Sequence, residues 1–330
     1  MSTTELSHDP VPAARPRAVP PSDLAQRIGD ALAHVIQGQR EVIETVITTV
    51  IAGGHLLLED VPGVGKTTLA TALARSISAE ARRIQFTSDM LPTDVTGLSV
   101  YDQESRRFQF HPGPIFANIV IGDEVNRATP KTQSALLEAM EERAVTVDGS
   151  THRLPELFVV VATQNPQDME GTFALPEAQR DRFMTRISLG YPDAASELRM
   201  LLSTSDRDPR VAAPAVATVD EVRAAQRAAA AVHLSPEVGG YIVDLVGATR
   251  SHSGVALGAS PRASVHVSRM SRARAAVHGR DYVSPDDVAS LAATVLSHRL
   301  VPQGRFARAD ESARAATEIV EEIVARTPLR

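Results

Sequence analysis

The chain of 330 residues contains no cysteine and no tryptophan, and only 4% of its residues are aromatic. Without cysteine it has no disulfide and no thiolate metal site, which fits a reducing compartment. The hydrophobic fraction is 43%, so aliphatic side chains and alanine must fill the core. No apolar run approaches the about 18 residues of a membrane span, and the amino terminus lacks the apolar core of a signal peptide. We therefore expect a cytoplasmic protein with no membrane span.

Lysine is nearly absent as well, because Lys66 and Lys131 are the only two in the chain and arginine supplies the remaining positive charge. The net charge of −6 argues against an overall nucleic-acid surface, although a local basic patch is compatible with it. Arginine stands at almost every basic position of the chain, yet position 66 is lysine. This exception indicates that the forked guanidinium of arginine would not fit there.

The most informative stretch runs from His55 to Ala74 and predicts a strand, a phosphate-binding loop and a helix. Gly63 and Gly65 can take backbone conformations closed to residues with a Cβ, so successive N–H groups turn inward at the positive end of the helix. Lys66 would reach the β- and γ-phosphates of a polyphosphate, and the Thr67 hydroxyl would ligate Mg²⁺.

The predicted cofactors are ATP and Mg²⁺, and the predicted nucleotide contacts span the whole loop: Asp60, Val61, Pro62, Gly63, Val64, Gly65, Lys66, Thr67 and Thr68. Asp60 stands where the strict phosphate-loop pattern has its first glycine. A plain tight turn between a strand and a helix is the structural alternative.

Two further buried strands are expected to deliver polar side chains to the same edge of a sheet. The strand at 119–124 ends in Asp123, which would hold the Mg²⁺ shell, and Glu124, which would orient and deprotonate the attacking water. A solvated acid pair at a strand end is the alternative. The strand at 157–162 precedes Asn165, either a turn residue or a sensor of the γ-phosphate.

Two arginines are the remaining candidates. A short helix at 175–183 carries Arg180 and Arg182, and the place of Arg182 beside the sheet but away from the phosphate loop suits a residue offered to a neighbouring subunit. Arg262 lies in the first turn of its helix, where a cation opposes the helix dipole by about 0.3 to 1 kcal/mol. A bound phosphate would compensate that charge.

The pattern along the chain predicts a disordered tail at 1–21, an α/β domain at 22–191 and a helical domain at 192–330. Two hairpins interrupt the first domain, at 98–110 and 144–154. The remaining elements of that domain are helices at 22–36, 40–52 and 130–142 and strands at 56–58, 84–87 and 184–189. Helices of the second domain are expected at 194–202, 219–232, 236–250, 261–278, 285–296 and 313–325.

With these residues in place, the chain resembles a MoxR-type AAA+ ATPase, of the clade with helix-2 and pre-sensor-1 inserts, from about Ser22 to the C-terminus. The resemblance rests on Leu-Glu-Asp-Val-Pro-Gly-Val-Gly-Lys-Thr (58–67), Gly-Pro-Ile-Phe-Ala-Asn (113–118), Asp-Glu-Val-Asn-Arg-Ala (123–128), Lys-Thr-Gln-Ser-Ala-Leu-Leu-Glu-Ala-Met (131–140), Ala-Thr-Gln-Asn-Pro (162–166) and Leu-Pro-Glu-Ala-Gln (175–179). Any one of these motifs would be weak, but their combination is specific.

The resemblance implies a RecA-like αβα P-loop NTPase domain with a parallel five-stranded sheet, followed by a small all-α lid, with subunits in a ring that is usually a hexamer. It assigns the Walker A role to Gly63, Gly65, Lys66 and Thr67, Walker B to Asp123 and Glu124, sensor 1 to Asn165, the arginine finger to Arg182 and sensor 2 to Arg262. Position 180 departs from the family by carrying arginine where an apolar residue is usual, so Arg180 competes with Arg182 for the finger role.

The resemblance also implies ATP hydrolysis coupled to remodelling, maturation or metal insertion of a protein client, often one with a von Willebrand factor A domain. The alternatives are a nucleic-acid-stimulated AAA+ motor, a magnesium-chelatase-like ATPase subunit and a nucleotide-binding scaffold without turnover. Arg106 and Arg107 in the first hairpin and Arg143 beside the second could line a pore for nucleic acid. The acidic balance and the lack of aromatic residues in the second hairpin argue against that motor.

Overall fold

The computed structural model describes residues 19–36, 38–60, 63–165, 172–191, 197–198, 213–306 and 308–329. Two of the predicted loop contacts, Val61 and Pro62, lie outside these ranges. So do the predicted tail as far as residue 18 and most of the helix expected at 194–202. The domain boundary at 191 falls next to this last gap and stays a prediction.

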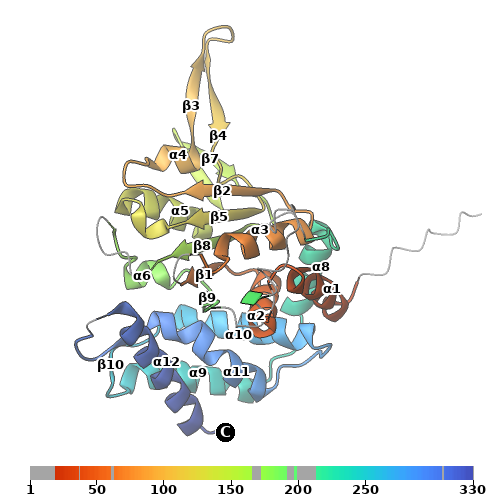
Figure 1. The fold of residues 1–330 in the computed structure, drawn as a ribbon, viewed down its shortest axis with the longest axis vertical. Helices are drawn as coiled ribbons and strands as arrows, with labels where there is room; N and C mark the ends of the chain where they lie inside the picture. The colour runs from red at the N-terminus through yellow and green to blue at the C-terminus, as the bar shows by residue number, and fades with distance from the viewer. Residues whose placement is uncertain are drawn as a thin grey trace, which may run out of the picture.

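A parallel sheet of five strands forms the centre of the first domain, in the spatial order β2-β5-β8-β1-β9 (Figure 1). The strands are β1 (Leu56–Glu59), β2 (Ala81–Gln85), β5 (Ile119–Asp123), β8 (Val159–Gln164) and β9 (Thr185–Ile187). The predicted sheet is confirmed, but β2 begins before the expected residue 84. It is an edge strand in which only Ile84 is buried, so it has almost no hydrophobic pattern.

The two faces of the sheet are buried in two separate apolar clusters, because successive side chains of a strand point to opposite faces. Leu56 and Leu58 belong to the cluster that includes residues of α1 (Pro21–Ala33), α2 (Arg40–Ile51) and α3 (Lys66–Ser76). Leu57 belongs to the other cluster, with residues of α5 (Pro130–Glu142). The layered αβα arrangement is therefore confirmed.

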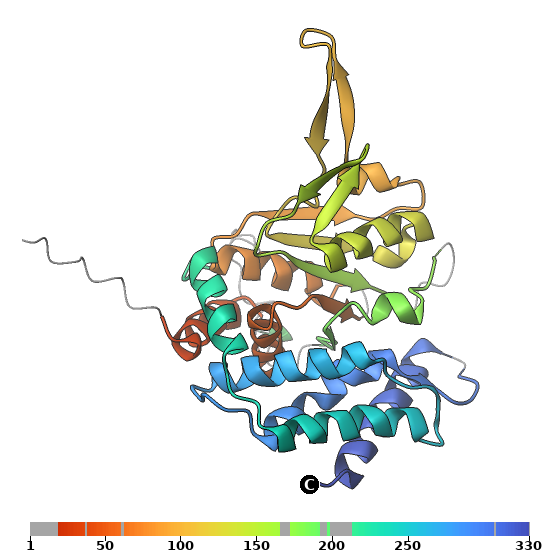
Figure 2. The same ribbon diagram turned by 180° about the vertical axis from the view of Figure 1, so that it is seen from behind.

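A helical lid follows the sheet domain and lies along the side of the sheet where β9 is the edge strand (Figures 1 and 2). It contains α9 (Pro236–Ser251), α10 (Pro261–Val277), α11 (Pro285–Leu296) and α12 (Ala309–Arg326), preceded by α8 (Val219–Ala230), which packs on α1 and α2. The side chains of Thr218, Ser235, Ser260 and Ser284 cap four of these helices. The pair β10 (Val255–Leu257) and β11 (Val301–Pro302) was not predicted, because strands this short carry no periodic pattern.

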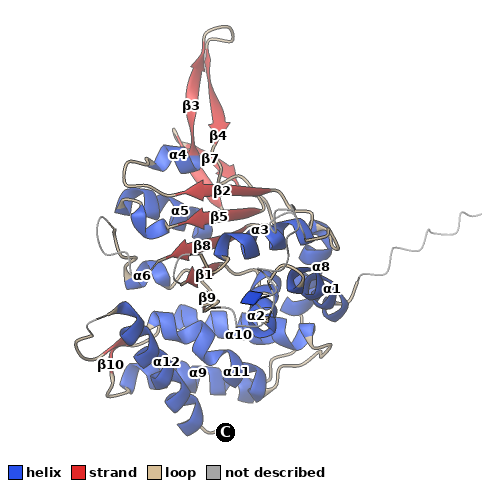
Figure 3. Ribbon diagram, in the orientation of Figure 1, coloured by secondary structure: helices blue, strands red, loops and turns tan. Residues whose placement is uncertain are grey.

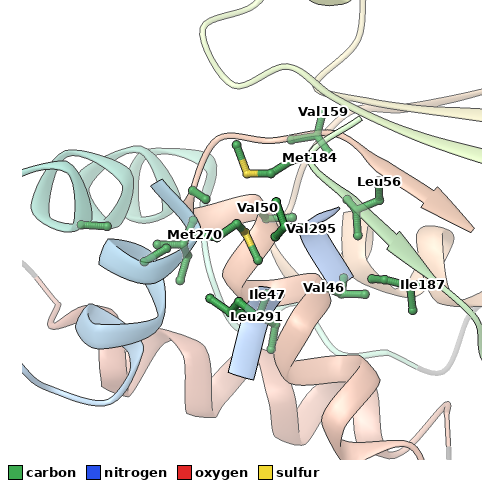
Figure 4. Packing of buried hydrophobic residues seen from close by; sticks show 14 of the residues in the cluster. Val46, Ile47, Val50, Leu56, Val159, Met184, Ile187, Met270, Leu291 and Val295 are labelled. Carbon is green, nitrogen blue, oxygen red and sulfur yellow. The ribbon is translucent and has the colours of Figure 1, made fainter. Parts of the chain in front are cut away.

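The lid docks on the sheet domain through apolar and polar contacts. Side chains from α2, β1, β9, α10 and α11 meet in one cluster (Figure 4). Beside it, the carboxylate of Asp181 accepts hydrogen bonds from Arg299 Nε at 2.8 Å and from Ser260 Oγ at 2.8 Å. Arg299 is almost fully buried, so replacing either Arg299 or Asp181 would leave an unpaired charge in the interior, which is costly. The start of α10 is thereby fixed against the sheet domain.

Both predicted hairpins are present. The first consists of β3 (Gly97–Asp102) and β4 (Arg107–Pro112) and projects from the body of the molecule (Figure 3), and the second of β6 (Ala144–Val147) and β7 (Ser150–Arg153). Tyr101 and Phe108 are 51% and 73% exposed on the first hairpin, with ring centroids 5.4 Å apart. A short helix, α4 (Pro92–Thr96), precedes this hairpin where a loop was expected. No helix in the described ranges is long and apolar enough to cross a membrane.

Candidate active site

The phosphate loop lies at the carboxyl end of β1 and leads directly into α3. Gly63 and Gly65 have φ angles of +86° and +93°, which residues with a Cβ rarely adopt. Gly65 is the N-cap of α3, no side chain caps this helix, and its first turn contains no acidic residue. The first N–H groups of α3 are therefore oriented to receive an anion. The backbone fits a bound polyphosphate.

Lys66 is held over this loop by two main-chain carbonyls. Its Nζ donates to the oxygen of Asp60 at 2.5 Å and to that of Gln164 at 3.3 Å. Burial lowers the pKa of Lys66, while the charges of Asp60, Asp123 and Glu124 oppose that shift. The ammonium is a compact cation between two strand ends, which is the place for a γ-phosphate contact.

Asp60 has a role that its sequence position did not reveal. Its carboxylate accepts hydrogen bonds from Ser188 Oγ at 3.0 Å and from the N–H of Gly190 at 2.7 Å, just after β9. The residue that replaces the first loop glycine thus ties the loop to the neighbouring strand. Its direct contact with nucleotide stays a prediction, as do those of Val64 and of Thr68 in the first turn of α3.

Asp123 lies 4% exposed at the end of β5. Thr67 Oγ1 donates to its carboxylate at 3.1 Å, Thr163 Oγ1 at 3.2 Å and Arg83 Nε at 2.6 Å. A hydroxyl beside a carboxylate is a set of hard oxygen ligands that fits Mg²⁺. Within the described ranges, no group of three or more His, Cys, Asp or Glu could hold a metal alone. A metal at Thr67 and Asp123 would therefore depend on phosphate oxygens for its other ligands.

Glu124 follows Asp123 in a left-handed conformation, with φ of +57° and ψ of +50°. Its N–H donates to Thr163 Oγ1 at 3.0 Å, which holds this unusual turn. Its carboxylate accepts from Gln85 Nε2 at 3.1 Å and pairs with Arg127 Nε at 3.2 Å. The turn separates the two acids, so that one faces Thr67 and the other faces the edge strand.

Asn165 directly follows β8 at the same edge of the sheet and is 7% exposed. Its main-chain oxygen accepts a hydrogen bond from Asn126 Nδ2 at 3.3 Å. Its neighbour Gln164 contacts Lys66, as described above. The structure therefore brings Lys66, Thr67, Asp123, Glu124 and Asn165 to the carboxyl ends of three adjacent strands, where open α/β sheets bind ligands.

Arg182 and Arg262 lie elsewhere, around a cavity of about 190 Å³ that we call the cationic pocket. Gly53, Gly54 and His55 line it, and these residues precede β1, so the pocket lies at the amino ends of the strands. The four residues of β1 span about 13 Å and separate it from the phosphate loop. No described residue of the loop lines the pocket.

Both arginines pair with one carboxylate, that of Glu141. The helix expected at 175–183 is shorter in the structure, where α6 spans Glu177–Arg180. Arg182 therefore lies in the turn after this helix and not on it. The negative charge that faces Arg262 in this structure is the side chain of Glu141, in place of the expected phosphate. Arg180 instead pairs with Glu177, with 3.8 Å between Nη2 and Oε1, and does not line the pocket.

The other ionisable groups leave the cationic pocket positively charged. Arg143 and Arg269 both line it and donate to the main-chain oxygen of Gly53, at 3.4 and 3.2 Å. Burial, with smaller effects from the arginines, lowers the pKa of His55 to about 4 and that of His266 to about 2. Both imidazoles are therefore neutral near pH 7, and Glu141 is the one acid among the described residues of the lining.

Two family models match the chain. Residues 55–185 match the ATPase family associated with various cellular activities (AAA), and residues 247–323 match the AAA lid domain. Together with the parallel sheet, the phosphate loop and the acid pair, these matches define the class as an AAA ATPase domain with its lid.

Relatives over most of the chain place it more closely. It is 46% identical to protein YeaC of Bacillus subtilis, over 86% of this chain and 90% of the relative. It is 41% identical to Chaperone MoxR1 of Mycobacterium tuberculosis (81% and 73%) and 34% identical to Protein MoxR of Paracoccus denitrificans (84% and 90%). A crystal structure from Cytophaga hutchinsonii, described as a candidate ATPase, is 36% identical with a TM-score of 0.83, over 94% of this chain and 96% of that one. The chain belongs to the MoxR-type AAA+ ATPases.

Several polar residues of these two sites were not predicted from the sequence, among them Thr163, Arg83 and Glu141. Thr163 was placed in a loop, although β8 extends through it and directs its hydroxyl toward Asp123. Arg83 lies on the edge strand whose start was not recognised. Glu141 carried only a weak signal, because it is an acid in the last turn of a helix, where it opposes the helix dipole, and its neighbour Glu142 shares that feature.

We expect the Lys66→Arg variant to lose affinity for Mg-ATP by about 10- to 100-fold, because a planar guanidinium cannot reproduce the two carbonyl contacts of the compact ammonium. Isothermal titration calorimetry measures this directly. Lys131→Arg is the matched control, since Lys131 is the other lysine of the chain and is exposed on α5. An unchanged Kd in Lys66→Arg would contradict the assignment of Lys66.

Proposed function

We propose that this protein hydrolyses Mg-ATP in a ring of subunits, with six as the expected number, and uses the cycle to remodel or mature a protein client. The membership of an ATPase family supports nucleotide hydrolysis. The chaperone name of the Mycobacterium tuberculosis relative supports a protein client. A location in the cytoplasm is part of the proposal and is supported by the absence of cysteine.

One observation supports assembly most strongly. The phosphate loop lies at the carboxyl ends of the sheet strands, and the cationic pocket lies at their amino ends. A developing negative charge on the γ-phosphate is stabilised in catalysis by arginine, within one chain or between chains. In this chain Arg182 and Arg262 lie at the edge away from their own loop. A neighbouring subunit packed edge to edge would bring its pocket to this loop, so the site is complete only between subunits.

The residues at the loop have distinct proposed roles. Gly63, Gly65 and Lys66 bind the phosphates, and Asn165 contacts the γ-phosphate. Mg²⁺ bound between Thr67 and Asp123 would neutralise charge on the β- and γ-phosphates. Glu124 orients the attacking water and accepts its proton, since its carboxylate is carried on a rigid turn beside the metal-binding acid.

The client surface is proposed on the β3–β4 hairpin. It projects from the body and exposes Tyr101 and Phe108, and exposed aromatic residues of this kind are enriched in protein interfaces (Figure 3). A client with a von Willebrand factor A domain, and metal insertion as the form of maturation, are the expectations that the family resemblance carries.

The Glu124→Gln variant is expected to bind Mg-ATP with the parental Kd and to hydrolyse it about 10²- to 10⁴-fold more slowly, because the amide cannot accept the proton of the attacking water. Phosphate release in the steady state and calorimetric binding on the same preparation separate the two effects. Hydrolysis at the parental rate would show that another group is the base.

The Arg182→Ala variant is expected to lower turnover by about 10³-fold or more, the usual value of an arginine that completes a phosphoryl-transfer site. Arg180→Ala serves as the comparison two residues away, since Arg180 pairs with Glu177 outside the pocket. It should retain turnover close to the parental rate. A loss confined to Arg180→Ala would reverse the assignment of the finger.

A further inference from the structure

One carboxylate joins two arginines that belong to different domains. Glu141 lies in the last turn of α5. Its Oε2 pairs with Arg182 Nη2 at 3.2 Å, in the turn that leads to β9, and its Oε1 accepts a hydrogen bond from Arg262 Nη2, in the first turn of α10 in the lid. The two guanidinium groups are thereby held by one carboxylate in the lining of the cationic pocket.

The positions of these charges on their helices are unfavourable without each other. The carboxyl end of α5 carries the negative end of a helix dipole, yet Glu141 adds a second negative charge there. The amino end of α10 carries the positive end, yet Arg262 adds a cation. Because these two ends face one another, the attraction between Glu141 and Arg262 offsets both penalties. The arrangement requires the pair.

Glu141 is the single acid among the pocket-lining residues that the structure describes. Among the described lining residues, the remaining charged groups are Arg143 and Arg269, which are held by the main-chain oxygen of Gly53. The neutral imidazoles of His55 and His266 add no negative charge near pH 7. Removal of Glu141 leaves four guanidinium groups around one small cavity. Arg182 and Arg262 then lose the carboxylate that they share, and their mutual repulsion would move them apart.

We propose that Glu141 is a positioning residue, which holds Arg182 and Arg262 at a fixed separation, ready to receive the γ-phosphate bound by a neighbouring subunit. This inference rests on the proposed function of the pocket between subunits. Glu141 lies in the pocket at the amino ends of the strands, away from the loop of its own chain, so its proposed effect on hydrolysis passes through the two arginines. It also links the lid to the sheet domain at the site where the neighbour docks.

The expected effect of Glu141→Ala is a fall in kcat of about 10- to 100-fold, the usual loss when a catalytic group is misplaced by about 1 Å, with an unchanged Kd for Mg-ATP. Glu141→Gln keeps one oxygen that can accept a hydrogen bond from one arginine, so its kcat should lie between that of Glu141→Ala and that of the parent. Glu142→Ala is the matched control, because Glu142 is the next residue of α5, is exposed and does not line the pocket. Its kcat should equal that of the parent.

Mixed assemblies distinguish positioning from general damage. Glu124→Gln subunits lack a working loop but keep their arginines, so they should restore hydrolysis when mixed with Arg182→Ala subunits, and equally when mixed with Glu141→Ala subunits. A mixture of Glu141→Ala and Arg182→Ala should show no more than the average of their two residual activities, because both carry a defective pocket. Light scattering on each mixture confirms that the subunits assemble together.

The outcomes separate the two proposals. If Glu124→Gln fails to restore Arg182→Ala, the site is not shared between subunits, and the proposed function falls together with the role of Glu141. If Glu124→Gln subunits restore hydrolysis to Arg182→Ala but not to Glu141→Ala, the site is shared between subunits and the positioning role of Glu141 is wrong. Full activity of Glu141→Ala alone would also overturn that role. Should Glu141→Ala not fold, the same mixtures made with Glu141→Gln decide the question.

Discussion

The direction of the parallel sheet determines where each functional charge of this protein can lie. Every strand leaves its carboxyl end at one edge, so the phosphate loop after β1, Asp123 after β5 and Asn165 after β8 gather there. Because the strands are parallel, the residues that precede β1 and β9 lie together at the amino ends of the strands. Arg182 and Arg262 lie beside them in the cationic pocket. A strand of four residues keeps the two groups about 13 Å apart. This separation within one chain is the basis of the proposal that the site is completed between subunits.

Electrostatics distinguishes these two edges. At the carboxyl edge Lys66 lies among carboxylates, and their charge counteracts the effect of burial on its pKa. At the amino ends, the described lining of the pocket contains four arginines and one carboxylate, that of Glu141. Burial keeps the imidazoles of His55 and His266 uncharged near pH 7. The lid contributes to this second edge because Arg299 and Ser260 bind Asp181 and so fix the start of α10. The lid here is part of the cationic pocket.

Much of the fold and half of the site could be predicted from the sequence, since local patterns carried them. Apolar runs predicted all five strands, although the start of β2 was placed too late, and the glycines, Lys66 and the acid pair marked the carboxyl ends of the strands. The amino edge depends on contacts between residues far apart in the chain: Arg262 and Glu141 are 121 positions apart. No local period or turn preference encodes such a pairing. Asp60 was likewise judged by its motif position, whereas its partners Ser188 and Gly190 come from the segment that follows β9.

The central claim is that hydrolysis takes place between subunits. The most direct test measures ATPase activity per subunit over a wide range of protein concentrations at saturating Mg-ATP, with the oligomeric state of the same samples followed by light scattering. Activity per subunit should be negligible for the monomer and rise to a plateau as the assembly forms. Full activity in samples that contain only monomer would contradict the account.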